Sequence, residues 1–465
     1  MRRENVALLH PGERMRTNPT LIAVLLLTGS GQALAEPSEL LRACAHRAEI
    51  AAAPVDPTGP FDPELATRAY LATISSQERA RSNAYFEGQQ WLHLWQFLLG
   101  AALSLVLLVT GLSAWMRDLA ERLTRWRPLQ TALYWAQYLI FTTLVSFPLA
   151  AYRGFIREHQ YGLANQTFGS WLSDQTKGFA VGLILGGVFV TVLYGVVRRL
   201  RRSWWIWGAL VSWLFVIFTL LISPVFIQPI FNKYTRLTDE PIRSSILRLA
   251  RANGIKASEI YQFNASKQSK RISANVSGFL GTERIALNDN LLKRASLPEI
   301  EAVMGHEMGH YVLNQLYKAL PFFGIFLLIG FAALRWGFDR SQTRWGSKWR
   351  VRGIGDVAGL PLAVLIVSTY LFLLTPLVNT YTRTMESEAD LFGLNAARQP
   401  DGMAKVTLKL AEYRKLEPGP FEEWILYDHP SGRARIFSAM RWKAENLALC
   451  PGTSSTGSAA SAAPQ

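Results

Sequence analysis

Six strongly apolar segments alternate with polar ones along the chain. They comprise residues 97–115, 131–152, 178–197, 203–232, 319–334 and 357–382. A helix needs about 20 apolar residues to cross a bilayer, so the pattern predicts six membrane spans. The fifth segment is the shortest, and Lys318 and Arg335 at its ends could extend their charged groups to the membrane surface.

The polar segments between these spans indicate the domain organisation. We expect a signal peptide or N-terminal anchor at residues 1–35 and an extracytoplasmic N-terminal segment at 36–90. A four-span membrane region (91–231), a polar insertion (232–317) and a two-span membrane region (318–381) follow. A C-terminal region (382–450) and a disordered tail (451–465) complete the chain. The tail is assigned as disordered because it consists largely of Ser, Ala, Gly, Thr and Pro.

The polar insertion combines a helical pattern with extended ones. Apolar residues spaced along one helix face predict an amphipathic helix over 241–253. Short β-prone segments then predict strands at 260–263, 272–279 and 284–287, the last two joined by a turn at Gly281-Thr282. The expected fold is therefore mainly α, a polytopic bundle of six or seven membrane helices with a small β-sheet outside the membrane.

Ser296 and Glu299 form a capping-box pattern that predicts the start of a second helix in the insertion. Ser296 can accept hydrogen bonds from first-turn amides while Glu299 reaches back to the Ser296 N–H, and Pro298 is tolerated in a first turn. The predicted helix continues through residues 306–310.

The formal charge of +15 raises the possibility of a nucleic-acid partner. Many basic residues, however, lie in three connections between predicted spans, 117–130, 198–203 and 335–355, which hold fourteen Lys or Arg against three acidic residues. All three fall on the same side of the membrane, as in the positive-inside pattern of cytoplasmic loops. The charge therefore indicates membrane topology and no nucleic-acid partner; the alternative is that these loops are basic only because they are solvated.

The N-terminal residues agree with this orientation. A basic stretch that ends at Arg16 precedes a short apolar segment, 21–27, and then Ala33-Leu34-Ala35, which resembles a signal-peptidase site. Cleavage after Ala35 would leave the new N-terminus outside the cytoplasm; the alternative is a retained seventh anchor. Both the insertion and the C-terminal region then lie outside, which predicts a bacterial inner-membrane protein with its soluble face in the periplasm.

Cys44 and Cys450 are the two cysteines of the chain. In this topology both lie on the oxidising side of the membrane, where disulfides persist. We expect them to pair and to tie the N-terminal segment to the C-terminal region. Two unrelated buried thiols are the alternative.

His306-Glu307-Met308-Gly309-His310 has the HExxH pattern. Residues four apart share one helix face, so the two imidazoles can converge on one tetrahedral ion while Glu307 stands beside the open coordination position. The alternative is a surface helix that carries two histidines without a metal. The insertion is thus expected to be a zincin-like metallopeptidase domain with one Zn²⁺ per chain.

Catalytic zinc needs a third protein ligand and leaves its fourth position to water. Glu386 directly follows the last predicted span, where a helix could hold it rigidly at the membrane surface. Asp390 lies four residues later on the same face and could accept a hydrogen bond from a ligating histidine. Glu388 points away by about 200° in an ideal helix and is the weaker choice of ligand; a solvated helix face at Glu386 is the alternative.

These motifs resemble the type I CAAX prenyl protease family of membrane zinc metallopeptidases, to which the heat-shock membrane protease branch is related. The HEMGH at 306–310 matches, as does an Asn-x-x-Ser-Arg-x-x-Glu-x-x-Ala-Asp pattern at 379–390, with Thr382 where Ser is usual. Weaker matches are a loop at 161–167, similar to the family's Gly-Phe-Asn-x-x-Thr, and the segment 428–435, similar to its His-Pro-Pro segment ending in Arg.

The resemblance implies a bundle of about seven helices around a chamber roofed by the two soluble segments. It points to His429 as a catalytic donor to the oxyanion, with Arg383 and Arg435 as organisers nearby, and to Asn275 as a contact for an extended peptide. A packed structural histidine and an ordinary hairpin strand are the respective alternatives. Eukaryotic members place the site on the cytosolic side, whereas the charge pattern here places it outside.

The sequence therefore predicts a zinc metalloendopeptidase, in which Glu307 accepts a proton from the attacking water and returns it to the leaving amine. Its expected partners are the lipid bilayer and a peptide or protein substrate. A bacterial-style signal segment favours membrane or envelope proteins over prenylated CAAX proteins as natural clients. The rival interpretations are a polytopic transporter and an inactive, metal-holding membrane protein; the oligomeric state stays open.

Overall fold

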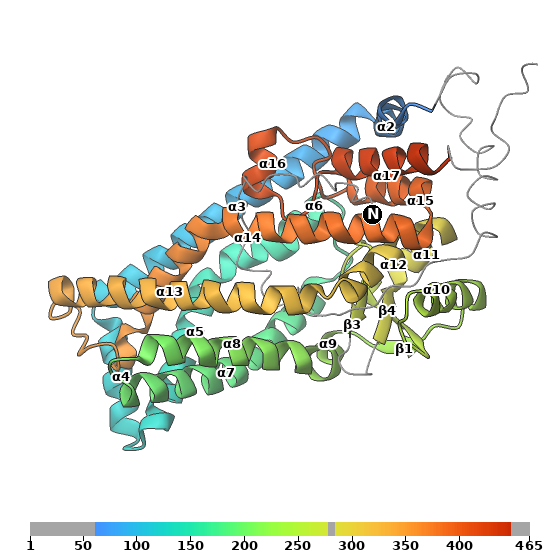
Figure 1. Ribbon diagram of the computed structural model, residues 1–465. Coiled ribbons are helices and arrows are strands. Elements are labelled where there is room, and N and C mark those ends of the chain that lie inside the picture. The colour runs from blue at the N-terminus through green and yellow to red at the C-terminus, as the bar shows by residue number, and fades with distance from the viewer. Residues whose placement is uncertain (1–60, 278–283, 448–465) are drawn as a thin grey trace, which may run out of the picture.

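The computed structural model describes residues 61–277 and 284–447 of the chain. The predicted signal segment, the Cys44–Cys450 pair, the Gly281-Thr282 turn and the C-terminal tail lie outside the described residues. Within these ranges the protein is a bundle of long helices with a small sheet at one end, as predicted (Figure 1).

Six helices in the described part of the chain are long and apolar enough to cross a membrane. They are α3 (Ser76–Val109), α5 (Arg127–Ala151, continued by η4 and α6 to Gln160), α7 (Phe168–Arg199), α8 (Trp204–Ile222, continued by η5 and α9 to Phe231), α13 (Gln315–Trp345) and α14 (Leu360–Ala397). The six predicted spans are thus confirmed, with α3 and α14 extending well beyond their apolar segments.

The first span extends beyond its apolar segment because the polar residues before it form the same helix. Ser75 caps α3, and Glu78 accepts the backbone N–H of Ser75 at 3.0 Å. The boundary predicted at residue 90 consequently lies inside one continuous helix. The short helix α2 (Pro63–Ala72) precedes it and packs on the C-terminal helix α17 (Gly432–Leu447).

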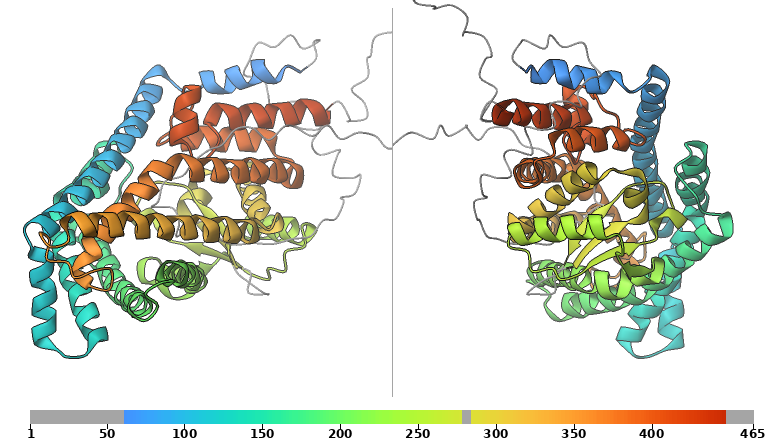
Figure 2. Two further views of the ribbon diagram at one scale, coloured as in Figure 1. Left: turned by 60° about the vertical axis from the view of Figure 1, so that its left-hand side comes forward. Right: turned by 90° about the vertical axis from the view of Figure 1, so that its right-hand side faces the viewer.

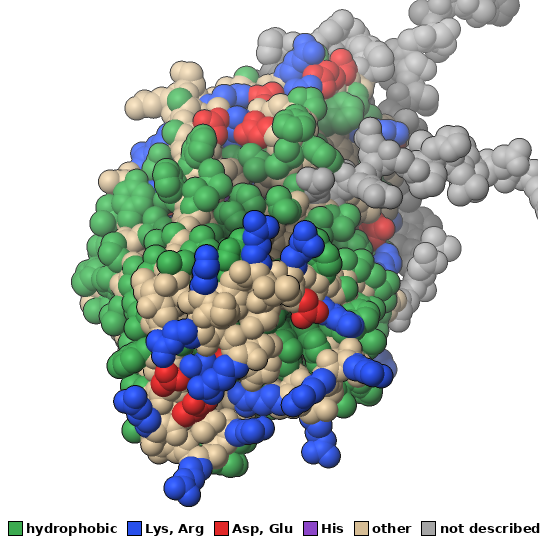
Figure 3. Space-filling model, turned by 90° about the vertical axis from the view of Figure 1, so that its left-hand side faces the viewer, with side chains coloured by type: hydrophobic (Ala, Val, Ile, Leu, Met, Phe, Trp, Pro, Cys, Tyr) green, Lys and Arg blue, Asp and Glu red, His purple; other side chains and the backbone are tan. Residues whose placement is uncertain are grey.

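The three basic connections meet at one end of the bundle. In α4 (Leu112–Leu123), Arg117 donates to the Asp356 carboxylate at 2.7 Å and to the Arg350 carbonyl at 2.9 Å. Arg198 at the end of α7 donates to the Gly355 carbonyl, also at 2.9 Å. Figure 3 shows Lys and Arg side chains gathered over this end with few acidic ones. The three connections predicted to share one side of the membrane therefore lie together at one end of the bundle.

The opposite end carries a four-stranded sheet with the order β1-β2-β4-β3. Its strands are β1 (Tyr234–Arg236), β2 (Ile260–Phe263), β3 (Ala274–Ser277) and β4 (Arg284–Asn288). β2 runs parallel to β4, with Ile260 opposite Ile285, and β3 runs antiparallel to β4, with Asn275 opposite Ala286. Three strands were predicted; β1 was not, because its three residues are too short to show a period-two pattern.

The soluble elements form layers around helix α12 (Leu297–Val312). On one side it packs against β3 and α10 (Glu240–Ala252), and on the other against α15 (Pro400–Leu410), which in turn packs on α17 (Figure 2). Side chains from each layer are fully enclosed in the shared core, among them Ile246, Ile260, Ile285, Ile300 and Ile436. The remaining short elements are η6 (Ala265–Lys267), α11 (Asp289–Arg294), η7 (Val357–Gly359) and α16 (Pro420–Leu426).

Helices α12 and α14 cross with their backbones in contact. A Cβ atom placed on Gly393 of α14 would lie 2.7 Å from the His306 backbone nitrogen, and one on Gly309 of α12 would lie 3.0 Å from the Ala389 Cα. Only glycine fits such a close approach. The crossing brings the two histidines of α12 within reach of carboxylates on α14.

Candidate metal centre

The start of α12 is fixed by the predicted capping box. The Glu299 carboxylate accepts the Ser296 backbone N–H at 2.6 Å and the Ser296 hydroxyl at 2.8 Å. Lys409 from α15 adds an ion pair to the same carboxylate at 2.7 Å. These contacts fix the first turn of the helix. His306 and His310 therefore project from one face in a defined direction.

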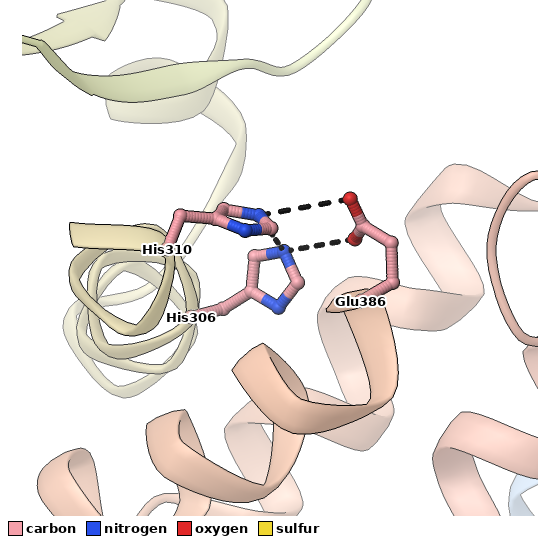
Figure 4. A group of neighbouring side chains, drawn as sticks. All are labelled: His306, His310 and Glu386. Atoms are coloured by element: carbon pink, nitrogen blue, oxygen red, sulfur yellow. Dashed lines mark hydrogen bonds and ion pairs between the residues drawn. The ribbon is translucent and has the colours of Figure 1, made fainter. Parts of the chain in front are cut away.

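Two histidines and one glutamate converge at the crossing of α12 with α14 (Figure 4). The Glu386 carboxylate lies 3.2 Å from His306 Nε2 and 3.6 Å from His310 Nε2. The two Nε2 atoms are themselves 3.2 Å apart. The three residues each offer one ligand atom, and these three atoms lie within 4.8 Å of one another. Such a spacing allows all three atoms to bind one metal ion.

The donor set fits zinc. Glu386 is only 2 % exposed, and the polar neighbours of its Oε2 atom are imidazole nitrogens, His306 Nε2 at 3.2 Å and His429 Nε2 at 3.3 Å. A buried carboxylate needs positive charge beside it, and a metal ion at these nitrogens would supply that charge. Two imidazole nitrogens and one carboxylate are the protein ligands of many catalytic zinc sites, which leave a fourth position for water.

His306 is oriented by the carboxylate of Asp390, which is itself held by the guanidinium of Arg435. Its Nδ1 lies 2.7 Å from the Asp390 carboxylate, and Arg435 Nε donates to the other Asp390 oxygen at 2.8 Å. Burial alone would lower the pKa of His306, but the charges and hydrogen bonds of Asp390 and Glu386 together outweigh burial and raise the pKa to about 10. Metal binding at Nε2 requires the neutral ring, so a bound metal would displace a proton from this side chain.

His310 is oriented by Gln315, the first residue of α13. Gln315 Oε1 lies 2.7 Å from His310 Nδ1, and Gln315 Nε2 donates to the Met385 carbonyl at 2.8 Å. Sequence reasoning missed Gln315, because a glutamine after the turn at Asn314 belongs to no recognisable motif. The amide connects the histidine helix to the helix that carries Glu386.

We expect Gln315→Leu to weaken metal binding by about 10- to 100-fold, the usual cost of losing a hydrogen-bond partner of a ligating histidine. Competition of the purified protein with a zinc-chelating dye measures the affinity. Gln342→Leu is the matched control, since Gln342 also donates to a backbone carbonyl, that of Val351, but at the far end of α13. Equal affinities for both variants would contradict the orienting role of Gln315.

Glu307 lies between the two histidines in sequence and is half-buried. Burial raises the pKa of its carboxyl above the ordinary value, while the positive charges of His310 and His306 oppose that rise. The described residues offer its carboxylate no hydrogen bond that would hold it in one protonation state. Such a group suits the exchange of a proton with a substrate or water.

His429 reaches the group from a third segment. Its Nε2 lies 3.3 Å from Glu386 Oε2, and its Nδ1 lies 2.7 Å from the Asp428 carboxylate. The carboxylate can accept a hydrogen bond from Nδ1, which leaves Nε2 directed into the site. Nε2 can donate a hydrogen bond there when it also carries a proton.

Arg383 lies beside the segment that carries His429, not beside the three ligand side chains. It donates to the Tyr427 carbonyl at 2.8 Å and to the Glu423 carbonyl. Asn379, one turn earlier on α14, donates to the Ile425 carbonyl at 2.7 Å. The predicted organiser thus acts on the backbone at the end of α16, just before His429.

The other predicted site residues occupy different places. Glu388, the weaker ligand choice, pairs with Lys318 at 2.9 Å and points away from the group. Asn275 lies on β3, at the edge of the sheet, and no hydrogen bond among the described residues joins its side chain to the three ligands. The structure therefore brings together all of the predicted site residues except Asn275 and Arg383.

Two family models cover most of the chain. Residues 66–233 match the model described as CAAX prenyl protease N-terminal, five membrane helices, and residues 236–443 match peptidase family M48. An uncharacterized metalloprotease of Bacillus subtilis, YhfN, is 31 % identical over 71 % of this chain and 78 % of its own length. CAAX prenyl protease 1 of Saccharomyces cerevisiae is 28 % identical over 63 % of this chain and 68 % of its own length.

The fold agrees with these matches. The crystal structure of Ste24p from S. mikatae superposes with a TM-score of 0.67 at 20 % identity, covering 81 % of this chain and 95 % of that one. The two chains therefore share a fold. The chain belongs to peptidase family M48 and is an integral-membrane metalloprotease.

Proposed function

We propose that the protein is a zinc metalloendopeptidase in which His306, His310 and Glu386 hold one zinc ion. The observation that carries the proposal is the convergence of these three side chains from two helices more than 70 residues apart in sequence, with the Glu386 carboxylate only 2 % exposed. A transporter is disfavoured because residues 236–443, which carry the metal centre, match a peptidase family.

A bound zinc would supply Lewis-acid activation of water and of the scissile carbonyl. Glu307 accepts the proton of the attacking water and returns it to the leaving amine. His429, positioned by Asp428, donates a hydrogen bond to the oxygen that becomes negative as the carbonyl is attacked. Asp390 and Arg435 hold the His306 ring, while Arg383 and Asn379 hold the backbone that leads to His429.

The substrate segment is proposed to bind as an added strand. Strand β3 is the edge of the sheet on the side that packs against α12, the helix with both histidines. An extended peptide paired with this edge would gain main-chain hydrogen bonds while its scissile bond faces the site. Asn275 on β3 is the proposed side-chain contact.

The proposed location is a bacterial inner membrane with the site in the periplasm. The end of the bundle that carries the basic connections lies opposite the sheet and the metal centre (Figure 1). Basic connections favour the cytoplasmic side, which leaves the site outside. Membrane or envelope proteins are then the proposed natural substrates, and prenylated peptides, suggested by the names of the relatives, are candidates for cleavage in vitro.

Purified protein should cleave an unstructured reporter peptide, lose that activity on treatment with 1,10-phenanthroline and regain it on addition of zinc. Removal of the metal should abolish turnover, because no other described group at the site can polarise the carbonyl comparably. Mass spectrometry of the products checks that an internal peptide bond is cut. Activity that survives complete removal of the metal would contradict the proposal.

A further inference from the structure

A basic cavity lies at the end of α13 remote from the metal centre. It has a volume of about 740 Å³ and is lined by Arg335, Arg340 and Arg344, together with Trp336 and with Trp205 from α8. This volume is within the range of about 300–1,000 Å³ that is usual for small-molecule sites. The cavity belongs to the end of the bundle whose basic surface Figure 3 shows.

The charge of the cavity is not neutralised internally. Three guanidinium groups face one acidic side chain, Asp339, whose nearest contact is Arg335 Nε at 4.0 Å. In the described part of the chain Arg340 and Arg344 form no ion pair, and Arg344 lies over the ring of Trp345 at 5.4 Å. Elsewhere at this end, Arg117, Arg350 and Arg352 are paired with carboxylates. The cavity therefore offers unpaired donors to an anion.

An apolar stripe leads along α13 into the cavity. Ile325, Ile329 and Trp336 are 60 %, 55 % and 72 % exposed, and with the exposed Ala332 they repeat at intervals of four, three and four residues. This spacing keeps them on one helix face. Because α13 is a membrane span, the stripe faces acyl chains. It ends at the cavity, where Ala332 and Trp336 belong both to the stripe and to the lining.

We propose that this cavity binds the headgroup of an anionic phospholipid. Guanidinium groups recognise phosphate oxygens through paired hydrogen bonds, and basic pockets between membrane helices bind such headgroups. The stripe on α13 accommodates an acyl chain, and the two tryptophans of the lining suit the membrane interface, where indole rings concentrate. A soluble phosphate compound would use the arginines but leave the apolar stripe uncovered.

Native mass spectrometry of the full-length protein in detergent tests the proposal. Added phosphatidylglycerol should bind, phosphatidylcholine should bind at least about tenfold more weakly, and Arg340→Gln/Arg344→Gln should lose about tenfold or more of the phosphatidylglycerol affinity. Arg122→Gln/Arg125→Gln is the matched control, since it removes the same charge from exposed positions of the same end outside the cavity. It should bind the lipid like the unsubstituted protein.

Three outcomes would overturn the proposal. Equal losses in both double variants would show that only the overall charge of this end matters. Equal binding of glycerophosphoglycerol, which has the headgroup without acyl chains, would identify a soluble phosphate compound as the ligand. As a second variant, Trp336→Ala should weaken lipid binding without changing the charge, and unchanged binding would also contradict the site.

Discussion

Glu307→Gln should lower the rate of peptide hydrolysis by about 10²- to 10⁴-fold, the usual contribution of a general acid–base group, while zinc content stays at the level of the unsubstituted protein. The amide fills the same space but cannot accept the proton of the attacking water. Neither His306 nor His310 is bonded to Glu307 in the structure, so the metal centre should survive the change.

The control for this variant is Glu301→Gln on the same helix. Glu301 accepts hydrogen bonds from Ser245 and Gln399, away from the histidines. Steady-state cleavage of the reporter peptide and zinc analysis of the same samples measure both quantities. Near-normal turnover in Glu307→Gln would remove the general-base assignment, and loss of zinc would show that Glu307 supports the metal instead.

Glu386→Gln should abolish turnover and weaken zinc binding by more than about 100-fold. Loss of a metal ligand lowers zinc affinity more than loss of a hydrogen-bond partner of a ligand, which costs up to about 100-fold. The neutral amide is a poor zinc ligand, and it would leave two imidazoles to hold the ion alone. Glu386 is buried beside both histidines. Among the described residues it is the carboxylate that forms a ligand group with His306 and His310, so no other side chain takes over as the third ligand.

Glu388→Gln is the matched control for that substitution. It lies two residues further along α14 and pairs with Lys318 at the surface. Its carboxylate also lies 3.5 Å from Gln315 Nε2, but the amide of glutamine can keep that contact, and the shorter bond of Gln315 Nε2 is to the Met385 carbonyl at 2.8 Å. Zinc affinity by dye competition and the rate of peptide cleavage should both stay close to those of the unsubstituted protein. If Glu388→Gln lost the metal and Glu386→Gln kept it, the assignment of the third ligand would be wrong.

The metal group could be predicted because it depends on local patterns. The capping box at Ser296 fixes where the helix begins, and the HExxH spacing then fixes which side chains share its face. Glu386 could be chosen over Glu388 because a helix continuing from the last span turns the two in different directions. The structure keeps that difference, with Glu388 bonded to Lys318.

Long-range packing explains what the sequence did not reveal. Gln315 reaches His310 through the turn at Asn314, whose left-handed backbone no motif predicts, and its second contact, to the Met385 carbonyl, is 70 residues away. Arg383 was expected close to the reacting groups, but its partners are carbonyls of α16, a helix that begins 37 residues later in the chain. The polar segment before the first span was expected to be helical after Pro63, but its continuity with that span in α3 was missed because polar and apolar residues follow one another within the same helix.

The most direct test is anomalous X-ray diffraction at the zinc edge from crystals of the purified full-length protein. A single anomalous peak should lie among His306 Nε2, His310 Nε2 and the Glu386 carboxylate, at about 2.0–2.2 Å from each, with solvent at the fourth position. A zinc peak elsewhere, or one in contact with the histidines but remote from Glu386, would contradict the proposed centre.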